Sequence, residues 1–470
     1  MANGTFHLIS LGCAKNTVDS DSMMQLLLRD GYEAVDRADQ AQVLIVNTCG
    51  FIGPAKQESI ETLRALAGAK REGQWLIAAG CLTQRYGADV ARQVPGVDGI
   101  LGTRRWMDIV TLLRDLRDGT HPEARYQIPD GAQTVGTDEA ATLRASVAGA
   151  SAYLKIADGC RRPCAFCAIP LIKGTAVSRP LPRILEEAQQ LRAAGVRELV
   201  LISQDTTDYG HDLGMKEGLA TLLEQLVRSV PSMDWIRVLY AFPGYVTDRL
   251  IEVMARHPQI VPYLDMPLQH AHPKTLRRMR RPSNMDWVHR TLEKMRTAMP
   301  DLAVRSTFIV GYPGETEEEF EALMQLVTEA RFDRVGAFQF SFEPGTASEG
   351  LGDPVLPEVK QMRFDRLMTA QQGISLQLNQ RQVGRELDVL IEGRDKGLAI
   401  GRSYRDAPEI DGLVFVEGEA KVGEMIRARI TSAMPYDLTA VLLSGQPARS
   451  QESALGSLPA ARAVRGTDGS

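Results

Sequence analysis

Three cysteines lie close together near the middle of the chain, at Cys160, Cys164 and Cys167. Gaps of three and two residues place the three thiols on one loop, just after the apolar run 152–157. Three thiolates can ligate three irons of a four-iron cluster, which leaves the fourth iron open to a substrate or cofactor. A zinc site and three buried thiols are the alternatives. Structural zinc sites usually have four ligands, and no fourth one is adjacent here, so the spacing favours a catalytic cluster on this Cys160 triad.

A second set of three cysteines, Cys13, Cys49 and Cys81, is spread over the first part of the chain. Each follows an apolar run that is typical of a strand, at residues 6–11, 43–46 and 75–79. Helical patterns between the runs predict a parallel sheet with flanking helices. Ligands bind such sheets at the carboxyl ends of the strands, so we expect these cysteines to converge into a second three-thiolate site, the Cys13 triad. Three isolated core cysteines are the alternative, which leaves their shared position unexplained.

The composition is that of a soluble chain with several domains. A length of 470 residues predicts about three domains, and a net charge of −5 gives no general attraction to nucleic acid. No apolar run reaches the roughly 18–20 residues of a membrane span. No basic segment precedes an apolar one at the N-terminus, as a secretory signal requires. We therefore expect a cytoplasmic protein without membrane contact, whose reduced cysteines serve as metal ligands.

The apolar runs divide the chain into parts. Residues 1–118 predict an open parallel α/β domain, and residues 119–148, rich in Gly, Pro and polar residues, predict a linker with room for a hairpin. Strand and helix patterns alternate again in residues 149–383, where strands are expected at 153–157, 198–203, 235–239, 263–266, 303–310 and 335–340. Six such units predict a partial, open (β/α)6 barrel. Barrel active sites lie at the C-terminal ends of the strands, and the Cys160 triad follows the first of them.

The last part of the chain has a different pattern of apolar residues. A long helix is expected over residues 357–382, broken near Gly373. Short alternating runs at 387–391, 413–416, 425–430 and 438–442 predict a small β-barrel over residues 384–445. Residues 446–470 are rich in Ser, Ala, Gly and Arg, which predicts a disordered tail. The expected fold class is therefore α/β, with a small C-terminal β-barrel.

The spacing Cys-x3-Cys-x2-Cys, with the aromatic Phe166 before the last cysteine, resembles the radical S-adenosylmethionine (SAM) superfamily. Together with the Cys13 triad and the C-terminal β-barrel it resembles the methylthiotransferases, whose last module is called TRAM. The strings that carry this resemblance are Ser10–Asn16, Asn47–Ile52, Gly80–Tyr86 and Leu154–Cys160. The string Gln204–Gly210 resembles the ribosomal-protein branch (RimO type) more than the tRNA branch (MiaB type). The resemblance covers residues 5 to 443.

The resemblance implies two 4Fe–4S clusters and SAM as cofactors. The cluster on the Cys160 triad binds SAM through its open iron and is the catalytic one, because SAM cleavage there yields a radical that abstracts hydrogen from carbon. The cluster on the Cys13 triad carries the inserted sulfur, and a second SAM supplies the methyl group. The implied target is the β-carbon of an aspartate in protein S-twelve of the small ribosomal subunit. An electron donor such as flavodoxin or ferredoxin, a sulfur donor and a monomeric enzyme are also expected.

Further residues are expected to bind the cofactor. They are Phe166, Ser178, Arg179, Gln204, Arg305 and Gly311. The planar fork of Arg179 suits a cofactor carboxylate, whereas a surface arginine at a helix start is the alternative. Arg305 contacts either SAM or carboxylates inside the barrel. His270 either lines the cavity or is satisfied structurally, and no role is assigned to Lys173.

Two rival functions are methylthiolation of tRNA adenosine and a non-catalytic iron–sulfur carrier or redox sensor. Residues 384–445 hold eight Lys or Arg against eleven Asp or Glu. An RNA-binding module should be basic, since phosphate contacts dominate its affinity. An acidic module suits a basic partner such as a ribosomal protein. A carrier does not need a six-unit barrel with a mouth the size of a cofactor.

Overall fold

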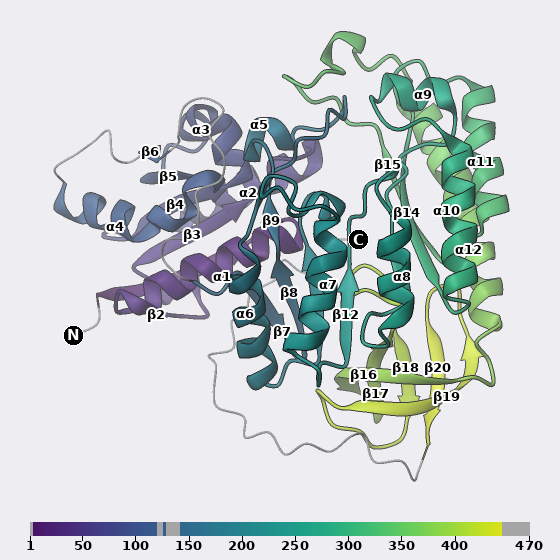
Figure 1. Cartoon of the computed structure of the whole chain (residues 1–470). Coiled ribbons are helices and arrows are strands. Elements are labelled where there is room, and N and C mark those ends of the chain that lie inside the picture. The colour runs from purple at the N-terminus through teal and green to yellow at the C-terminus, as the bar shows by residue number, and fades with distance from the viewer. Residues whose placement is uncertain (1–2, 120–125, 128–141, 444–470) are drawn as a thin grey trace.

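The computed structural model describes residues 3–119, 126–127 and 142–443 (Figure 1). The expected tail and most of the expected linker lie outside these residues. Three parts follow one another along the chain in Figure 1: an α/β unit in purple and blue, a larger strand–helix unit in teal and green, and a small yellow β-barrel. This arrangement confirms the expected fold class. Among the described residues, no helix is long and apolar enough to cross a membrane.

The N-terminal unit is built on a six-stranded sheet in which every pairing is parallel, in the order β2-β1-β3-β4-β5-β6. Its strands are β1 (Gly4–Ser10), β2 (Tyr32–Ala34), β3 (Val43–Thr48), β4 (Trp75–Gly80), β5 (Gly99–Gly102) and β6 (Tyr126–Gln127). Its helices are α1 (Ala14–Arg29), α2 (Gly53–Ala69), α3 (Cys81–Gln93) and α4 (Ile109–Asp118). The three expected strands are confirmed as β1, β3 and β4, and the sequence reasoning missed the other three.

Strand β3 lies in the middle of this sheet and is buried along its whole length. Successive side chains of a strand point to opposite faces. Val43 and Ile45 accordingly join the core beneath α1 and α4, while Leu44 and Val46 join a second core with α2 and α3. Because helices cover both faces of the sheet, the strand is a continuous run of apolar residues. This run is why the strand could be found from the sequence.

The central unit contains six parallel strands, as expected for a partial barrel. They are β8 (Ser151–Lys155), β11 (Glu198–Ile202), β12 (Trp235–Val238), β13 (Tyr263–Asp265), β14 (Ala303–Val310) and β15 (Arg334–Gln339). A parallel bridge between Ile236 and Ile260 connects the two halves of the unit. A seventh strand, β7 (Ala145–Ala148), forms an antiparallel hairpin with β8 at one edge.

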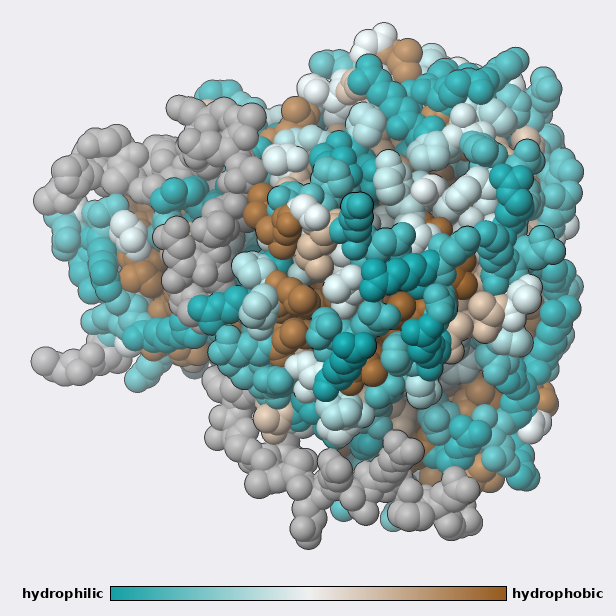
Figure 2. Space-filling view, viewed as in Figure 1, coloured by the Kyte–Doolittle hydropathy of each residue, from teal (hydrophilic) through white to brown (hydrophobic). Residues whose placement is uncertain are grey.

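Helices cover the outer side of these strands (Figure 1). They are α6 (Leu181–Ala193), α7 (Gly218–Ser229), α8 (Asp248–Arg256), α10 (Met285–Ala298) and α11 (Glu317–Ala330), with short α5 (Ile169–Lys173) and α9 (Pro273–Arg278) in the loops. Figure 2 shows that polar residues cover most of the surface on the viewed face, with hydrophobic residues in smaller patches. This distribution agrees with amphipathic helices that bury one face against the sheet.

Helix α12 (Pro357–Gln380) runs without interruption, so the expected break near Gly373 is wrong. Glycine inside a helix costs only about 1 kcal/mol relative to alanine. Leu367 and Ile374, on either side of Gly373, are buried in the main core of the central unit. Packing of this helix therefore outweighs the local preference of the glycine.

The last unit is a closed five-stranded barrel in the order β16-β17-β18-β20-β19. Its strands are β16 (Glu386–Asp395), β17 (Leu398–Ser403), β18 (Val414–Glu417), β19 (Met425–Ala433) and β20 (Leu438–Leu442). It lies at the N-terminal ends of the central strands, because Arg402 binds Glu198 at the start of β11 and Asp406 binds Arg334 at the start of β15. The small barrel therefore lies at the end of the central unit opposite to the Cys160 triad.

Candidate active site

The loop that carries the Cys160 triad leaves the barrel through a glycine. After β8 comes the short strand β9 (Ala157–Asp158), and then Gly159 with a φ of +80°. A Cβ atom on Gly159 would lie 2.1 Å from the carbonyl oxygen of Thr175, so no other residue fits there without a shift of the backbone. The Cys160 N–H then donates to the carbonyl of Gly174 at 3.0 Å. The first cysteine is thus fixed by a backbone contact between two loops.

Each sulfur of the Cys160 triad accepts one N–H group at 3.5 Å. The donors are the backbone N–H of Arg162, the backbone N–H of Ile169 and the guanidinium of Arg281. Hydrogen bonds to the sulfurs tune iron–sulfur clusters. The donor set therefore fits three thiolates that share a negatively charged cluster.

Burial raises the pKa of Cys160 to about 11 and that of Cys167 to about 12. A thiol in such surroundings stays protonated at neutral pH unless a cation takes the place of the proton. Metal binding releases thiol protons, so iron would supply the positive charge that the loop itself lacks. The two raised pKa values thus fit a site built to be metallated.

The Cys13 triad lies at the carboxyl edge of the N-terminal sheet. Cys13 caps α1 three residues after β1, Cys49 follows β3 directly, and Cys81 begins α3 directly after β4. Strands β1, β3 and β4 are adjacent and parallel, so their carboxyl ends meet. A Cβ atom placed on Gly12 would lie 3.1 Å from the sulfur of Cys49. The three cysteines therefore lie at the ends of adjacent strands, and their joining into one site stays a prediction.

The three thiols of this triad differ in their electrostatic surroundings. Burial raises the pKa of Cys49 to about 11 and that of Cys81 to about 12. Desolvation also opposes the thiolate of Cys13, but Lys15 and the backbone N–H groups at the start of α1 outweigh it and lower the pKa of Cys13. A helix N-terminus and a nearby cation are known to favour a thiolate. Cys13 is therefore the thiol of this triad that ionises first.

Within the described residues, no three His, Cys, Asp or Glu side chains lie close enough to hold one metal ion. A zinc ion needs all its thiolates at about 2.3 Å from one centre. A four-iron cluster gives each thiolate its own iron and accepts a wider spacing. Both triads consist of three thiols and no carboxylate, which is the donor chemistry of such a cluster.

The predicted cofactor contacts Ser178 and Arg179 follow the Cys160 loop. Ser178 Oγ accepts the Gly210 N–H at 2.8 Å, which joins two loops at the barrel mouth. The guanidinium of Arg179 binds Glu187 on α6 at 2.5 and 2.8 Å and donates to the Lys155 carbonyl. Arg179 would have to exchange Glu187 for a cofactor carboxylate, so its contact with SAM stays a prediction.

Gln204 contacts the residue that precedes the Cys160 loop, and Phe166 lies within that loop. Gln204 Nε2 donates to Asp158 at 3.1 Å, while its buried Oε1 atom has no hydrogen-bond partner in the described part of the chain. A buried acceptor without a donor is costly, and the amino group of SAM would satisfy it. Phe166 packs on an apolar cluster with Tyr312 and Phe340.

Arg305 and Gly311, both predicted to contact SAM, have other partners in the structure. Arg305 lies in the first half of β14, where it binds Asp265 at 3.0 Å and lies 3.5 Å from Asp411 of the small barrel. This position matches the alternative of a partner for barrel carboxylates. A Cβ atom on Gly311 would lie 2.4 Å from Lys360 of α12, so the glycine permits a close approach of that helix.

Comparison with known proteins agrees with these three units. Residues 5–102 match the model described as Uncharacterized protein family UPF0004, residues 154–327 match the Radical SAM superfamily, and residues 383–443 match the TRAM domain. The chain is 51% identical over 454 residues to the protein named ribosomal protein uS12 methylthiotransferase RimO of Chloroflexus aurantiacus, covering 93% of this chain and 100% of that protein. The chain belongs to the RimO family. The protein of the same name from Roseiflexus sp. is 48% identical, over 92% of this chain and 96% of that protein.

Solved structures of other enzymes share the RimO-family fold seen here. TsrM from Kitasatospora setae, a radical S-adenosylmethionine methyltransferase, gives a TM-score of 0.55 at 13% identity over 74% of each chain. The cobalamin-dependent S-adenosylmethionine radical enzyme OxsB gives 0.51 at 10% identity, over 79% of this chain and 56% of that chain. At such low identities the likeness concerns the fold alone.

A buried cluster of charges ties the two halves of this RimO-family site together. Asp19 on α1 binds Arg144, Lys155 and Lys173 at 2.5, 2.5 and 2.8 Å. Asp158 binds the same two lysines at 3.1 and 3.2 Å. The cluster adjoins both triads, because Asp158 precedes the Cys160 loop and α1 begins after Cys13. Sequence reasoning missed this cluster, since its five charges come from four separate segments.

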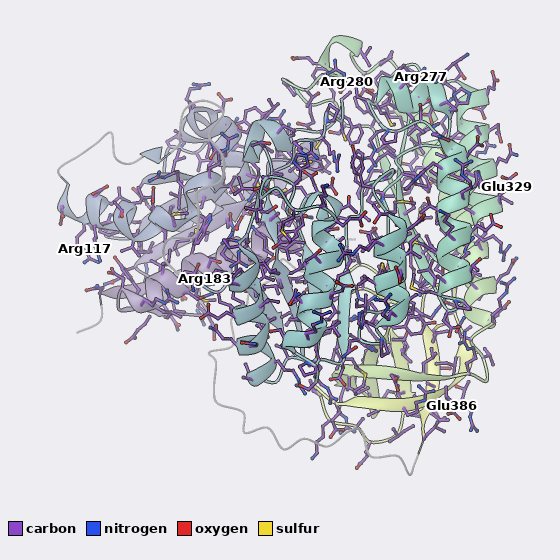
Figure 3. All side chains as sticks on the ribbon, in the orientation of Figure 1. Arg117, Arg183, Arg277, Arg280, Glu329 and Glu386 are labelled. Carbon is purple, nitrogen blue, oxygen red and sulfur yellow. The ribbon has the colours of Figure 1, made fainter. Side chains whose placement is uncertain are left out.

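His270, which the sequence placed at the mouth, has both ring nitrogens hydrogen-bonded within the protein. His270 Nδ1 accepts the His272 N–H, so Nε2 carries the proton and donates to the buried Glu315 at 3.1 Å. His270 is therefore satisfied structurally, as one alternative predicted. Figure 3 shows Arg277 and Arg280 at the edge of the molecule beside α9. Arg281, next along the chain, is buried and turns inward to the Cys160 triad.

Proposed function

We propose that this chain is a radical SAM methylthiotransferase that adds a methylthio group to the β-carbon of an aspartate in ribosomal protein uS12. The observation that carries the proposal is the pairing of two three-thiol sites, one on each α/β unit, across a buried charge cluster. An iron–sulfur carrier needs one such site and no barrel mouth. The relatives named RimO support the choice of uS12 as the substrate.

We propose that the Cys160 triad and the Cys13 triad each hold one 4Fe–4S cluster. When bound, the first cluster with SAM supplies the radical chemistry that breaks a C–H bond, and the second supplies sulfur. The chain itself ligates iron through the six thiolates and stabilises them with N–H donors. Gln204 Oε1 is proposed to accept a hydrogen bond from the amino group of SAM, with Phe166 and Ser178 shaping the loops around it.

The proposal includes partners beyond the substrate. An external electron donor such as flavodoxin or ferredoxin and a sulfur donor are required, and we propose that the enzyme acts as a monomer in the cytoplasm, where ribosomes are. The proposed domains are residues 1–118, 149–383 and 384–445, with residues 119–148 as the linker between the first two and residues 446–470 as a tail.

Mass spectrometry of small-subunit proteins and of tRNA from cells lacking the protein tests the substrate. We expect the methylthio group to be lost from uS12 and retained on tRNA. Loss from tRNA alone would identify tRNA adenosine as the substrate instead. The reconstituted protein should also produce 5′-deoxyadenosine from SAM and a reductant, and a Cys160→Ala variant should not. Absence of this product from the intact protein would contradict an enzymatic role altogether.

A further inference from the structure

Lys15 reaches from one half of the site to the other. It lies two residues after Cys13, in the first turn of α1. Its ammonium group lies 3.3 Å from the centre of the Tyr240 ring. Tyr240 follows β12 at the carboxyl end of the barrel strands. The positive charge of Lys15 therefore lies at the barrel mouth, next to the loop of the Cys13 triad.

The lysine has no carboxylate partner. Among the residues that the structure describes, no Asp or Glu oxygen forms an ion pair with Lys15. The other lysines that are not exposed each bind a carboxylate: Lys56, Lys70, Lys155, Lys173 and Lys360. Cys13, Tyr240 and Asp265 favour its charged form electrostatically, but in the described part of the chain no carboxylate oxygen lies within ion-pair distance of it. Lys15 therefore has unused capacity to bind a negatively charged ligand.

Tyr240 holds the ammonium in a fixed place. Its backbone has a φ of +63°, which is rare for a residue other than glycine. The Tyr240 N–H donates to Asp265 at 2.9 Å, and its carbonyl accepts the Thr206 N–H at 3.1 Å, so the two neighbouring strand ends maintain this conformation. Unusual backbone conformations of this kind cluster at ligand sites. The ring attracts the ammonium by its face but carries no formal negative charge of its own.

We propose that Lys15 binds the side-chain carboxylate of the substrate aspartate and so selects an acidic side chain. This inference rests on the proposed function and names the residue that recognises its target. The β-carbon is bonded directly to the carboxyl carbon. Anchoring the carboxylate on Lys15 therefore holds the β-carbon beside the Cys13 triad. A neutral nucleobase gains nothing from this charge.

The test compares binding of two probes to the cluster-loaded enzyme: purified uS12, and uS12 in which the target aspartate is replaced by asparagine. The native enzyme should bind the aspartate form about 10- to 100-fold more tightly, as a hydrogen bond between charged groups provides. Lys15→Met should bind both forms equally, and Lys15→Arg should restore part of the preference. Lys294→Met is the matched control, because Lys294 lies on the outer helix α10 in an exposed ion pair, and it should keep the full preference.

Iron content and 5′-deoxyadenosine formation are measured on the same samples. Methylthiolation should fall in Lys15→Met, and these two measurements show how much of the fall comes from lost iron or slower SAM cleavage. If Lys15→Met keeps the preference for aspartate, the inference is overturned, whatever its iron content. If the native enzyme cleaves SAM but leaves uS12 unmodified, the proposed function fails instead. The preference is a ratio within one protein, so a general loss of stability cancels from it.

Discussion

Replacing Asp19 by Asn should loosen the contact between the N-terminal unit and the barrel. The Asp19 side chain is 1% exposed and accepts hydrogen bonds from Arg144, Lys155 and Lys173. Burial alone would raise the pKa of Asp19, but the three cations outweigh it and hold the pKa far below its usual range. An asparagine keeps the shape and removes the charge, so three buried cations would share Asp158 alone.

The size of this effect follows from the burial. Removing one partner of a buried ion pair costs about 3–5 kcal/mol. We expect a loss of this order in the free energy of unfolding for Asp19→Asn. The cluster adjoins both cysteine triads, so the ratio of methylthiolated product to 5′-deoxyadenosine should also fall, because the radical would form while the sulfur site is misplaced.

Urea unfolding and the product ratio measure the two effects in one preparation. Asp248→Asn is the control, since Asp248 pairs with Lys294 at the surface with 80% of its side chain exposed. Surface pairs contribute about 0–1 kcal/mol. An Asp19→Asn protein with the stability and the product ratio of the control would refute the view that this cluster aligns the two sites.

Three further predictions concern single positions. Burial would raise the pKa of Glu198, but Arg402 and Arg237 outweigh it and lower the pKa from 4.5 to about 2. The ionised carboxylate therefore stabilises the fold above pH 4.5, and this contribution disappears as the pH falls toward 2. In urea unfolding of the cluster-free protein, Glu198→Gln should lack this loss of stability at low pH. Gly373→Ala should raise the free energy of unfolding by about 0.5–1 kcal/mol, and a decrease would contradict the unbroken helix. Gly159→Ala should lower the bound iron, and full iron content would show that the loop tolerates a Cβ atom.

Continuous apolar runs made some strands easy to predict, whereas very short or glycine-bounded strands were missed. β3 and β11 are buried throughout. β2 has only three residues, and β5 begins and ends with glycine. Such segments become strands because an adjacent strand offers its hydrogen bonds, which is a property of the sheet and not of the segment.

The site could be predicted only as far as backbone position determines it. The six cysteines stand at strand ends, and parallel strands bring their ends together. Side-chain pairing was not accessible in this way. Glu187, on a neighbouring helix, forms an ion pair with Arg179, and Asp411, in another unit of the fold, lies near Arg305. The charge of an arginine predicts that it has a partner, whereas the fold decides which one.

The small β-barrel is net acidic, and its position limits how this charge can influence the choice of substrate. It lies at the N-terminal ends of the central strands, far from the mouth where the reacting side chain would bind. Its arginines Arg402 and Arg405 are buried against the central unit, and truncation would leave Glu198 and Asp333 without these partners. Truncation therefore alters stability together with docking. The carboxylate of Glu386, at the lower edge of the molecule in Figure 3, is exposed and pairs with Arg429 instead, so charge changes there test recognition of the partner without breaking those buried pairs.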